Sequence, residues 1–369
     1  MRVEIVVVGA GIVGASVAYR LACAGAAVTV LDAKRAGGGT SAATFARINA
    51  NRKEPLTYYL LNRAGMAEHL LLRRELGDGS WLHLVGNLEW DAQPERLRRK
   101  VRRLQERGYD ADLVTRAELY ALEPDLAAPD DIEEIAYYPS EGYVDVAVVI
   151  GLLLRAARER GATIRLGCRV TGLDETGGHV SGVVTAEGTR SVVMGADLVV
   201  SCTGRWTDEL AQRAGVRVPL APTAGLLVLT APVPTRVRSI VHTEEIAMRA
   251  DGGGRLMLHA AALDARVEAN LDGDERRAIA AESVRRASRI LPALKGVPYE
   301  AVRLGVRAMP VDGLPIVGPY PGLASLYVVC SHSGVTLGPL LGRIVADEIV
   351  RSRVDERIMP FRSERLLAG

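Results

Sequence analysis

Three glycines close to the N-terminus, Gly9, Gly11 and Gly14, have the spacing G-x-G-x-x-G, and Asp32 follows them. In dinucleotide-binding proteins the first glycine allows a tight turn, the second lets the backbone approach the pyrophosphate, and the third lets a helix pack closely on a strand. An acidic residue about 20 positions further on accepts hydrogen bonds from the adenosine ribose and repels the 2′-phosphate of NADP. The pattern therefore predicts a site for NAD or FAD.

The segments around these glycines predict the elements that such a site requires. Residues 5–8 are a β-branched run, which is typical of a strand buried on both faces of a parallel sheet, and a helical pattern begins directly after the glycines. Residues 27–31 predict a second strand that ends at Asp32. We expect the phosphates at the positive N-terminal end of the helix, next to Ile12 and Val13.

The loop after the second strand favours FAD over NAD. Residues 33–43 are rich in glycine and hydroxyl side chains, and such a loop can wrap around a ligand and donate backbone N–H groups to phosphate. A simple NAD domain usually proceeds to its next strand instead. Ala33, Arg35, Thr40 and Ser41 are the candidate cofactor contacts in this loop.

Several segments resemble the D-amino acid oxidase family of FAD enzymes, which includes glycine oxidase and monomeric sarcosine oxidase. The resemblance begins with the loop 33–43 and the segment 44–51, TFARINAN. Residues 305–318, GVRAMPVDGLPIVG, are similar to the family segment G-x-R-x-x-x-x-D-G-x-P-x-I-G. Residues 199–206 resemble the strand and turn that pass the FAD, and Val170 matches a valine whose backbone meets adenine. The matches span most of the chain, and they imply FAD as the cofactor.

The resemblance implies further contacts with FAD in distant parts of the chain. In relatives, the glycine-containing turn and helix start that correspond to residues 332–336 face the flavin ring. Their backbone N–H groups would stabilise negative charge on the reduced flavin. The further candidate contacts are Arg47, Ile48, Val170, Thr203, Gly204, Trp206, Arg307, His332, Ser333, Gly334, Val335 and Thr336.

Three residues are candidates for the chemistry. An arginine is the best ligand for a substrate carboxylate, because its planar fork makes two parallel charge-assisted hydrogen bonds. Arg307 aligns with the arginine that has this role in glycine oxidase relatives. The alternative is that Arg307 pairs with Asp312 and stabilises the turn between them.

Arg255 and His259 lie four residues apart on a predicted strand, so their side chains are expected on one face of that strand. The resemblance implies that Arg255 replaces the oxygen-activating lysine of sarcosine oxidase and that His259 faces the flavin; a solvent-facing strand arginine is the other interpretation.

Arg47 has two open roles. The resemblance places Arg47 and Asn49 close to the isoalloxazine ring, where Arg47 either shapes an acidic substrate pocket or binds an FAD phosphate. We expect the FAD to be bound non-covalently. Residues 302–311 contain no cysteine and residues 37–50 contain no histidine, so the segments that carry covalent attachment in relatives lack the required side chain.

The expected fold class is α/β. A Rossmann-type FAD-binding domain would take residues 1–80, 140–215 and 305–369, and an interleaved α+β substrate domain with an antiparallel sheet would take residues 81–139 and 216–304.

Residues 216–304 carry the patterns that predict this second sheet. Strands are expected at 225–229, 246–249 and 255–259, and a helix at 274–290 is ended by Pro292.

The composition excludes several other classes of function. The net charge is +2, which gives no electrostatic reason to expect a nucleic acid or an anionic membrane as partner. The four cysteines are scattered singly, so neither disulfide bonds nor a metal site are expected. No apolar run reaches the ~18 residues that a membrane-spanning helix needs. The N-terminal residues do not have the pattern of a signal peptide. The sequence therefore predicts a cytoplasmic protein.

The leading functional hypothesis is oxidation of a small amine or amino acid to an imine, with oxygen as acceptor and hydrogen peroxide as product. One alternative is a dehydrogenase that passes electrons to a quinone or carrier, and another is oxidation of a 2-hydroxy acid. A non-catalytic flavin-binding protein is the third, although nothing in the sequence shows a loss of catalysis. The expected partners are the substrate and an electron acceptor, with a homo-oligomer possible.

Overall fold

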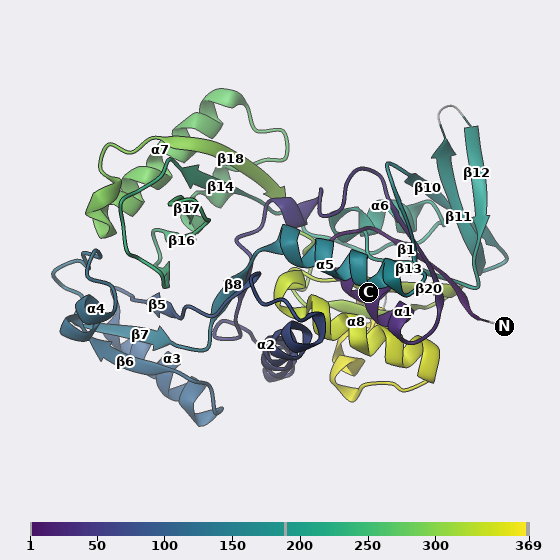
Figure 1. Cartoon of the computed structure of the whole chain (residues 1–369), viewed down its shortest axis with the longest axis horizontal. Helices are drawn as coiled ribbons and strands as arrows, with labels where there is room; N and C mark the ends of the chain where they lie inside the picture. The colour runs from purple at the N-terminus through teal and green to yellow at the C-terminus, as the bar shows by residue number, and fades with distance from the viewer. Residues whose placement is uncertain (1, 188–189, 367–369) are drawn as a thin grey trace.

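The computed structural model describes residues 2–187 and 190–366. It has two lobes, each built on a large β-sheet, and the chain passes between them several times (Figure 1). We name them the nine-stranded lobe, on the right of Figure 1, and the eight-stranded lobe, on the left.

The nine-stranded lobe contains the parallel sheet that the sequence predicts. Its strands are β1 (Glu4–Val8), β2 (Ala27–Asp32), β9 (Thr163–Leu166), β10 (Arg169–Thr176), β11 (His179–Glu187), β12 (Arg190–Gly195), β13 (Leu198–Ser201), β19 (Ile316–Tyr320) and β20 (Leu323–Cys330). The order β20-β13-β1-β2-β9 is parallel throughout. Parallel strands end at one edge of the sheet, where ligands of this fold bind. The Rossmann-type α/β fold is thereby confirmed.

Helices cover this sheet and complete its core. They are α1 (Ile12–Cys23), α5 (Val146–Glu159), α6 (Thr207–Gln212) and α8 (Gly334–Arg351). Strand β1 is buried on both faces as expected, because Val7 packs in one hydrophobic core and Val8 in the core on the opposite face. Helices α1 and α8 pack backbone to backbone: a Cβ at Gly342 would lie 2.6 Å from the backbone of Ser16.

The eight-stranded lobe is built from two separate stretches of chain. Its strands are β5 (Asn87–Glu89), β6 (Asp112–Thr115), β7 (Glu134–Tyr138), β14 (Ala224–Thr230), β15 (Ile240–His242), β16 (Ala247–Ala250), β17 (Leu256–His259) and β18 (Tyr299–Val306). They lie in the order β18-β14-β17-β16-β15-β5-β7-β6. The pairs are antiparallel as expected, except that β15 and β5 are parallel where the two stretches meet.

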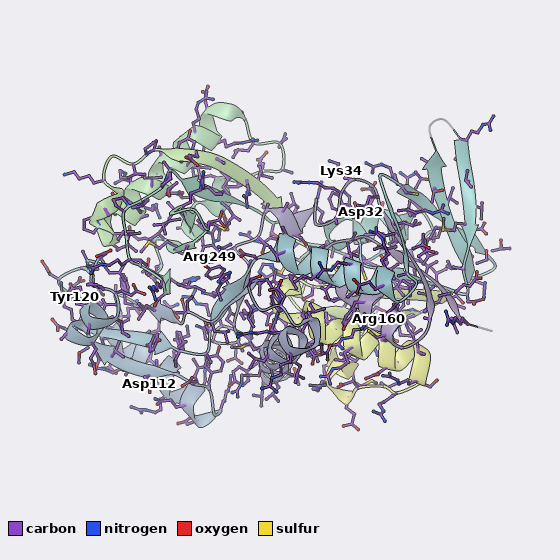
Figure 2. All side chains as sticks on the ribbon, in the orientation of Figure 1. Asp32, Lys34, Asp112, Tyr120, Arg160 and Arg249 are labelled. Atoms are coloured by element: carbon purple, nitrogen blue, oxygen red, sulfur yellow. The ribbon has the colours of Figure 1, made fainter. Side chains whose placement is uncertain are left out.

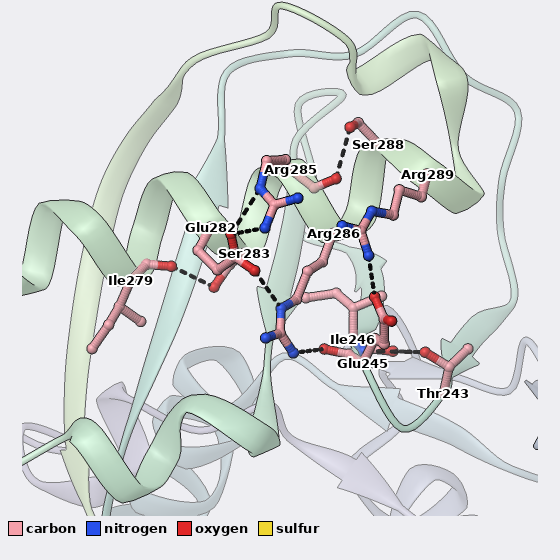
Figure 3. A network of polar contacts seen from close by, with 10 residues as sticks. All are labelled: Thr243, Glu245, Ile246, Ile279, Glu282, Ser283, Arg285, Arg286, Ser288 and Arg289. Carbon is pink, nitrogen blue, oxygen red and sulfur yellow. Dashed lines mark hydrogen bonds and ion pairs between the residues drawn. The ribbon is translucent and has the colours of Figure 1, made fainter.

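Three helices, α3 (Pro94–Glu106), α4 (Arg116–Leu122) and α7 (Gly273–Ile290), cover the eight-stranded sheet. Figure 3 shows how α7 holds the turn between β15 and β16. Arg289 Nη1 lies 2.9 Å from Glu245 Oε2, and Arg286 donates to the Glu245 carbonyl at 3.4 Å. The Thr243 hydroxyl donates to the Ile246 carbonyl at 2.9 Å. These contacts fix the position of His242, the last residue of β15.

The two lobes meet at a three-stranded sheet of β3 (Arg47–Ile48), β8 (Gly142–Val144) and β4 (Leu82–His83), beside α2 (Leu56–Leu76). Arg249 of β16 is 3% exposed and donates to the Phe45 carbonyl at 2.7 Å. Its guanidinium lies 4.4 Å from the centre of the Tyr143 ring. Figure 2 shows Arg249 on the side of its lobe that faces the nine-stranded lobe. This buried arginine therefore holds the segment before β3 against the eight-stranded lobe.

The discontinuous domain borders stay a prediction. Strand β18 belongs to the eight-stranded sheet as far as Val306, two residues beyond the border expected at residue 304. The remaining short helices are 3₁₀ helices: η1 (Thr40–Ala42), η2 (Gly204–Trp206), η3 (Ala261–Arg266), η4 (Pro292–Leu294), η5 (Glu356–Phe361) and η6 (Ser363–Leu366). Within residues 2–187 and 190–366, none of the helices combines the length and apolar character needed to cross a membrane.

Candidate cofactor and substrate site

A cavity of about 450 Å³ opens at the carboxyl ends of β1, β2, β13 and β20. This volume lies in the range of cofactor and ligand sites, and the position is the one that a doubly wound sheet offers. Many of the predicted contacts line it: Gly9, Gly11, Ile12, Val13, Asp32, Ala33, Thr40, Ser41, Val170, Thr203, Gly204, Trp206, His332, Gly334 and Val335. The structure thus brings together segments that are far apart in the sequence.

The glycine turn leaves room that side chains would fill. Gly9 has φ of 105°, and a Cβ there would lie 2.5 Å from the Cys202 carbonyl oxygen. A Cβ at Gly14 would lie 1.8 Å from the Gly9 carbonyl oxygen, which no packing tolerates. At Gly11, which lines the cavity, a Cβ would be 3.2 Å from Ser41 Oγ. Gly14 itself does not line the cavity but allows α1 to begin at this turn, the role expected for the third glycine.

Asp32 lies at the carboxyl end of β2 on the cavity wall. Its Oδ2 accepts the Ala10 N–H at 2.8 Å, and its Oδ1 accepts the Lys34 N–H at 2.9 Å. These two backbone donors hold the carboxylate between the glycine turn and the following loop. A carboxylate fixed in this way suits the ribose hydroxyl groups of the cofactor.

Four basic side chains that were not among the predicted cofactor contacts also line the cavity. They are Lys34, Arg169, Arg205 and Arg213, whereas the predicted Arg35 lies outside the lining. Lys34 directly follows the predicted contact Ala33, which also lines the cavity. Arg205 lies with its guanidinium 4.1 Å from the Trp206 ring centre. Positive charge and open backbone N–H groups at a helix start suit a pyrophosphate.

The start of α8 forms another part of the cavity wall. Ser331, His332, Gly334 and Val335 line it, and Ser331 Oγ is buried with no hydrogen-bond partner in the described part of the chain. Burial lowers the pKa of His332 to about 4, and the positive charges of Lys53 and Arg307 act in the same direction. His332 is therefore neutral at physiological pH.

Two predicted contacts of this helix point elsewhere, as their side-chain partners show. Ser333 Oγ lies 2.6 Å from the Tyr58 hydroxyl, and Thr336 Oγ1 donates to the Arg47 carbonyl at 3.2 Å. Both side chains fasten α8 to neighbouring segments, so only their backbones remain as candidate contacts with FAD. Ile48 is 1% exposed in the hydrophobic core and does not line the cavity.

Arg307 and His259 come together at the edge of the eight-stranded sheet, next to Ala308 of the cavity wall. Arg307 Nη1 donates to the Ala224 carbonyl at 2.8 Å, and Nη2 forms an ion pair with Asp264. His259 Nε2 lies 3.1 Å from Asp264 Oδ2 and 3.4 Å from Arg307 Nη2. Burial opposes the ionisation of Asp264, but hydrogen bonds from His259 and Arg307 outweigh it and lower the Asp264 pKa.

Asp264 was not identified from the sequence, because one partner, Arg307, is 43 residues away and follows a different strand from that of His259. The alternative pairing of Arg307 with Asp312 does not occur. The Asp312 carboxylate instead accepts from Arg365 Nε at 2.6 Å.

Arg255 lies away from this group. It closes the turn before β17, and its Nε is 2.6 Å from Glu300 Oε2 on the surface, with 40% of the side chain exposed. The structure therefore favours the solvent-facing interpretation for Arg255.

Arg47 does not line the cavity, which weakens its role as a ligand of an FAD phosphate. Its Nη1 lies 2.5 Å from His242 Nδ1, on the side of the eight-stranded lobe.

Two of the four cysteines, Cys168 and Cys202, line the cavity. Burial raises the pKa of the Cys202 thiol well above its usual value, so the thiolate nucleophile is suppressed. We therefore expect non-covalent FAD. Precipitation of the purified holoprotein with acid should leave all flavin absorbance in the supernatant. Flavin that remains in the washed pellet would contradict this prediction.

Known proteins share this fold and its motifs. The model of the FAD dependent oxidoreductase family (DAO) matches residues 4–348. Glycine oxidase of Geobacillus kaustophilus is 26% identical over 377 residues, which cover 98% of this chain and 96% of the relative. L-proline dehydrogenase from P. horikoshii superposes with a TM-score of 0.86 at 21% identity, covering 100% of this chain and 98% of that one. L-amino acid deaminase from Proteus vulgaris superposes with a TM-score of 0.85 at 22% identity, covering 99% and 94%.

The cavity also passes a test of fit for the cofactor of this family. The glycine turn has space that a side chain would fill, and the cavity wall carries the carboxylate of Asp32 and several cations. The buried hydroxyl of Ser331 has no hydrogen-bond partner among the described residues. The family match covers most of the chain, and it agrees with the resemblance read from the motifs. The chain is a member of the FAD dependent oxidoreductase family, and its cofactor is FAD.

Proposed function

We propose that this protein oxidises the C–N bond of a small amine or amino acid to an imine, with oxygen as the acceptor and hydrogen peroxide as the second product. The observation that carries the proposal is the position of Arg307, whose chain neighbour Ala308 lines the FAD cavity. A carboxylate bound by Arg307 would hold the α-carbon of an amino acid near the start of α8, where we expect the flavin ring. Glycine oxidase and L-proline dehydrogenase, both similar to this chain, are named for amino acids.

The residues around Arg307 can orient a substrate. When bound, FAD supplies the redox chemistry, because it accepts the hydride equivalent from the α-carbon. Arg307 directly follows β18, and the Ala224 carbonyl and Asp264 fix the direction of its guanidinium. His259 from β17 shares Asp264 and lies with its ring centre 6.5 Å from that of Phe45. His332, which is neutral, adds no positive charge to repel the amine. Positioning of this kind contributes to the rate by fixing the reacting geometry.

A dehydrogenase that uses a quinone or carrier is the second candidate. The observation in its favour is the position of Arg255, which pairs with Glu300 on the surface and so leaves the expected oxygen-activating position without its candidate. L-proline dehydrogenase is also among the proteins with this fold.

The test is anaerobic mixing of the yellow holoprotein with glycine, sarcosine, D- and L-amino acids and, as a control set, 2-hydroxy acids. We expect an amine or amino acid to bleach the flavin absorbance near 450 nm, and air to restore it with release of peroxide. Bleaching by amines without peroxide would replace the oxidase by the dehydrogenase. Bleaching by hydroxy acids alone would overturn the proposed C–N chemistry.

A further inference from the structure

A second group of cations lies near the start of α8, where we expect the flavin ring. It consists of Arg47 on β3 and Lys53 in the following loop, and we call it the Arg47–Lys53 pair. Neither residue lines the cavity, but His332 does, and its pKa is lowered by the charge of Lys53 as well as by that of Arg307. Contacts place the pair beside the start of α8. The Lys53 ammonium lies 5.6 Å from the centre of the Tyr58 ring, whose hydroxyl is 2.6 Å from Ser333 Oγ, and the Arg47 carbonyl accepts from Thr336 Oγ1 at 3.2 Å.

The guanidinium of Arg47 is held by neutral acceptors. Its Nη1 meets His242 Nδ1 at 2.5 Å, and the pKa of His242 is lowered well below its usual value by burial and by the charge of Arg47. His242 is thus a neutral acceptor. With the Asn49 amide oriented so that its oxygen faces Arg47, that oxygen accepts from Nη2 at 3.0 Å and also from Nε. These contacts orient Arg47 without neutralising its charge.

Arg47 also keeps unused donors. Arginine has five N–H groups, and the contacts with His242 and Asn49 engage one on Nη1, one on Nη2 and the one on Nε. One N–H on each terminal nitrogen is left, which is the arrangement that binds a carboxylate through two parallel hydrogen bonds. Lys53 forms neither an ion pair nor a side-chain hydrogen bond among residues 2–187 and 190–366; its ammonium lies 5.6 Å from the centre of the Tyr58 ring.

The neighbouring cations are paired, in contrast to Arg47 and Lys53. Arg52 and Lys100 share Glu89, at 2.7 Å and 2.6 Å. Arg307 is paired with Asp264. A positive charge that is buried without a counter-charge lowers the stability of the folded protein. Such a charge therefore indicates a site where a ligand supplies the counter-charge.

Glu141 offsets the charge of Arg47 and Lys53 only in part, because one carboxyl faces two cations and burial raises the pKa of that carboxyl. This fully buried carboxyl accepts the Tyr109 hydroxyl at 2.6 Å and forms no ion pair with Arg47 in the described structure. Asn51, between Arg47 and Lys53 in the sequence, is 2% exposed, and neither atom of its amide has a partner in the described part of the chain. Such buried polar atoms are expensive unless water or a ligand satisfies them.

We propose that the Arg47–Lys53 pair binds a second carboxylate of the substrate, so that the preferred substrate is an amine or amino acid with two carboxylates. One carboxylate binds at Arg307 and the other at the pair. This substrate class rests on the proposed function, but the anion site itself does not, because it concerns binding only.

Non-reactive ligands test the anion site without any turnover. Succinate is compared with butyrate, and glutarate with valerate, by titrating the oxidised holoenzyme and following the perturbation of the flavin spectrum. These pairs match chain length and differ by one carboxylate. We expect each dicarboxylate to bind about 10-fold more tightly or better, the magnitude of one charge-assisted contact. Equal affinity within both pairs would overturn the proposal.

Variants assign this preference to the pair. Lys53→Met and Arg47→Met should each reduce the affinity for dicarboxylates towards that for monocarboxylates, while Lys53→Arg should retain it. Arg52→Met is the matched control on the same loop, because Arg52 is already paired with Glu89 and should leave the preference unchanged. Flavin content and thermal unfolding are measured for every variant. A preference that survives both Met substitutions in folded holoenzyme contradicts the proposal.

The pH dependence gives an independent readout. Burial and the charges of Arg47 and Arg52 lower the pKa of Lys53 to about 8, while Glu141 opposes them. Lys53 is charged below this pH and loses its proton above it, so the preference for dicarboxylates should weaken above about pH 8. Lys53→Arg should remove this alkaline loss. Lys100, which is paired with Glu89, titrates in the same range because burial lowers its pKa to about 8, so the part of the alkaline loss that Lys53→Arg removes is the part that belongs to Lys53. His332, with its pKa lowered to about 4, is neutral throughout this range.

The two proposals fail separately. If dicarboxylates bind preferentially but no amine bleaches the flavin, the anion site stands and the proposed C–N oxidation fails. If amines with one carboxylate bleach the flavin as readily as those with two, and ligand affinities show no preference, the oxidation stands and the second carboxylate site fails.

Discussion

Replacement of Gly14 with alanine should abolish the binding of FAD. The added Cβ would lie 1.8 Å from the Gly9 carbonyl oxygen and 3.2 Å from the Cys202 side chain. The nearest obstacle is backbone, which cannot rotate away as a side chain can, so either the turn or the start of α1 must move. Moving either displaces the N–H groups that we assign to the pyrophosphate. Overpacking of this kind also costs about 1–3 kcal/mol of stability.

The measurement is the ratio of flavin to protein after purification, together with reconstitution by added FAD and thermal unfolding. We expect Gly14→Ala to retain less than about one tenth of the wild-type flavin, because a loss of about 1.4 kcal/mol in binding already lowers affinity tenfold. Gly151→Ala is the matched control. Gly151 lies in α5, and a Cβ there meets nothing within 4 Å, so this variant should keep its flavin and gain up to about 1 kcal/mol of stability. A yellow, stable Gly14→Ala protein would show that the turn adapts and that the third glycine is dispensable.

The cofactor site could be predicted because its constraints are local. The turn from Gly9 to Gly14 and the carboxylate of Asp32 belong to one strand-helix-strand unit, and their backbone bonds join neighbours such as Ala10 and Lys34. Within such a unit, the residue types that fit each position are few. The position of the loop after Asp32 was also predicted, although Lys34 rather than Arg35 lines the cavity.

The substrate side could not be predicted to the same extent, because its contacts are long-range. Arg47 and His242 are 195 residues apart, and Arg249 and Phe45 are 204 apart. Nothing in the local pattern of either partner indicates the other, since the contacts exist only after the lobes have packed together.

Arg255 shows why spacing alone left two interpretations open. It was expected at the start of the strand that ends with His259, but its N–H donates to the Gly252 carbonyl at 3.0 Å and it closes the turn instead. Its side chain is therefore not part of the pleat, and the spacing of four residues on one face does not apply.

Removal of the Arg307 guanidinium should raise the half-saturating concentration of a carboxylate substrate by about 100-fold or more. Two charge-assisted hydrogen bonds of roughly 1.5–3 kcal/mol each would be lost, and each 1.4 kcal/mol is a factor of about ten. Arg307→Met alone would leave Asp264 as a partly buried carboxylate without its cation, so the effect on substrate would be mixed with a loss of stability. The double variant Arg307→Met with Asp264→Asn avoids this.

Asp264→Asn alone supplies the control that separates charge from structure. In the wild type, Asp264 competes with the substrate for Arg307, and His259 shares the same carboxylate. Its replacement by the neutral amide should leave the substrate affinity equal or raise it, whereas the double variant should lose it. Stopped-flow reduction under anaerobic conditions measures both the dissociation constant and the rate of reduction, and the flavin ratio shows that the cofactor is retained. If the double variant keeps the wild-type dissociation constant, Arg307 does not bind the carboxylate. The guanidinium would then serve to hold η3 against β14 through Asp264 and the Ala224 carbonyl.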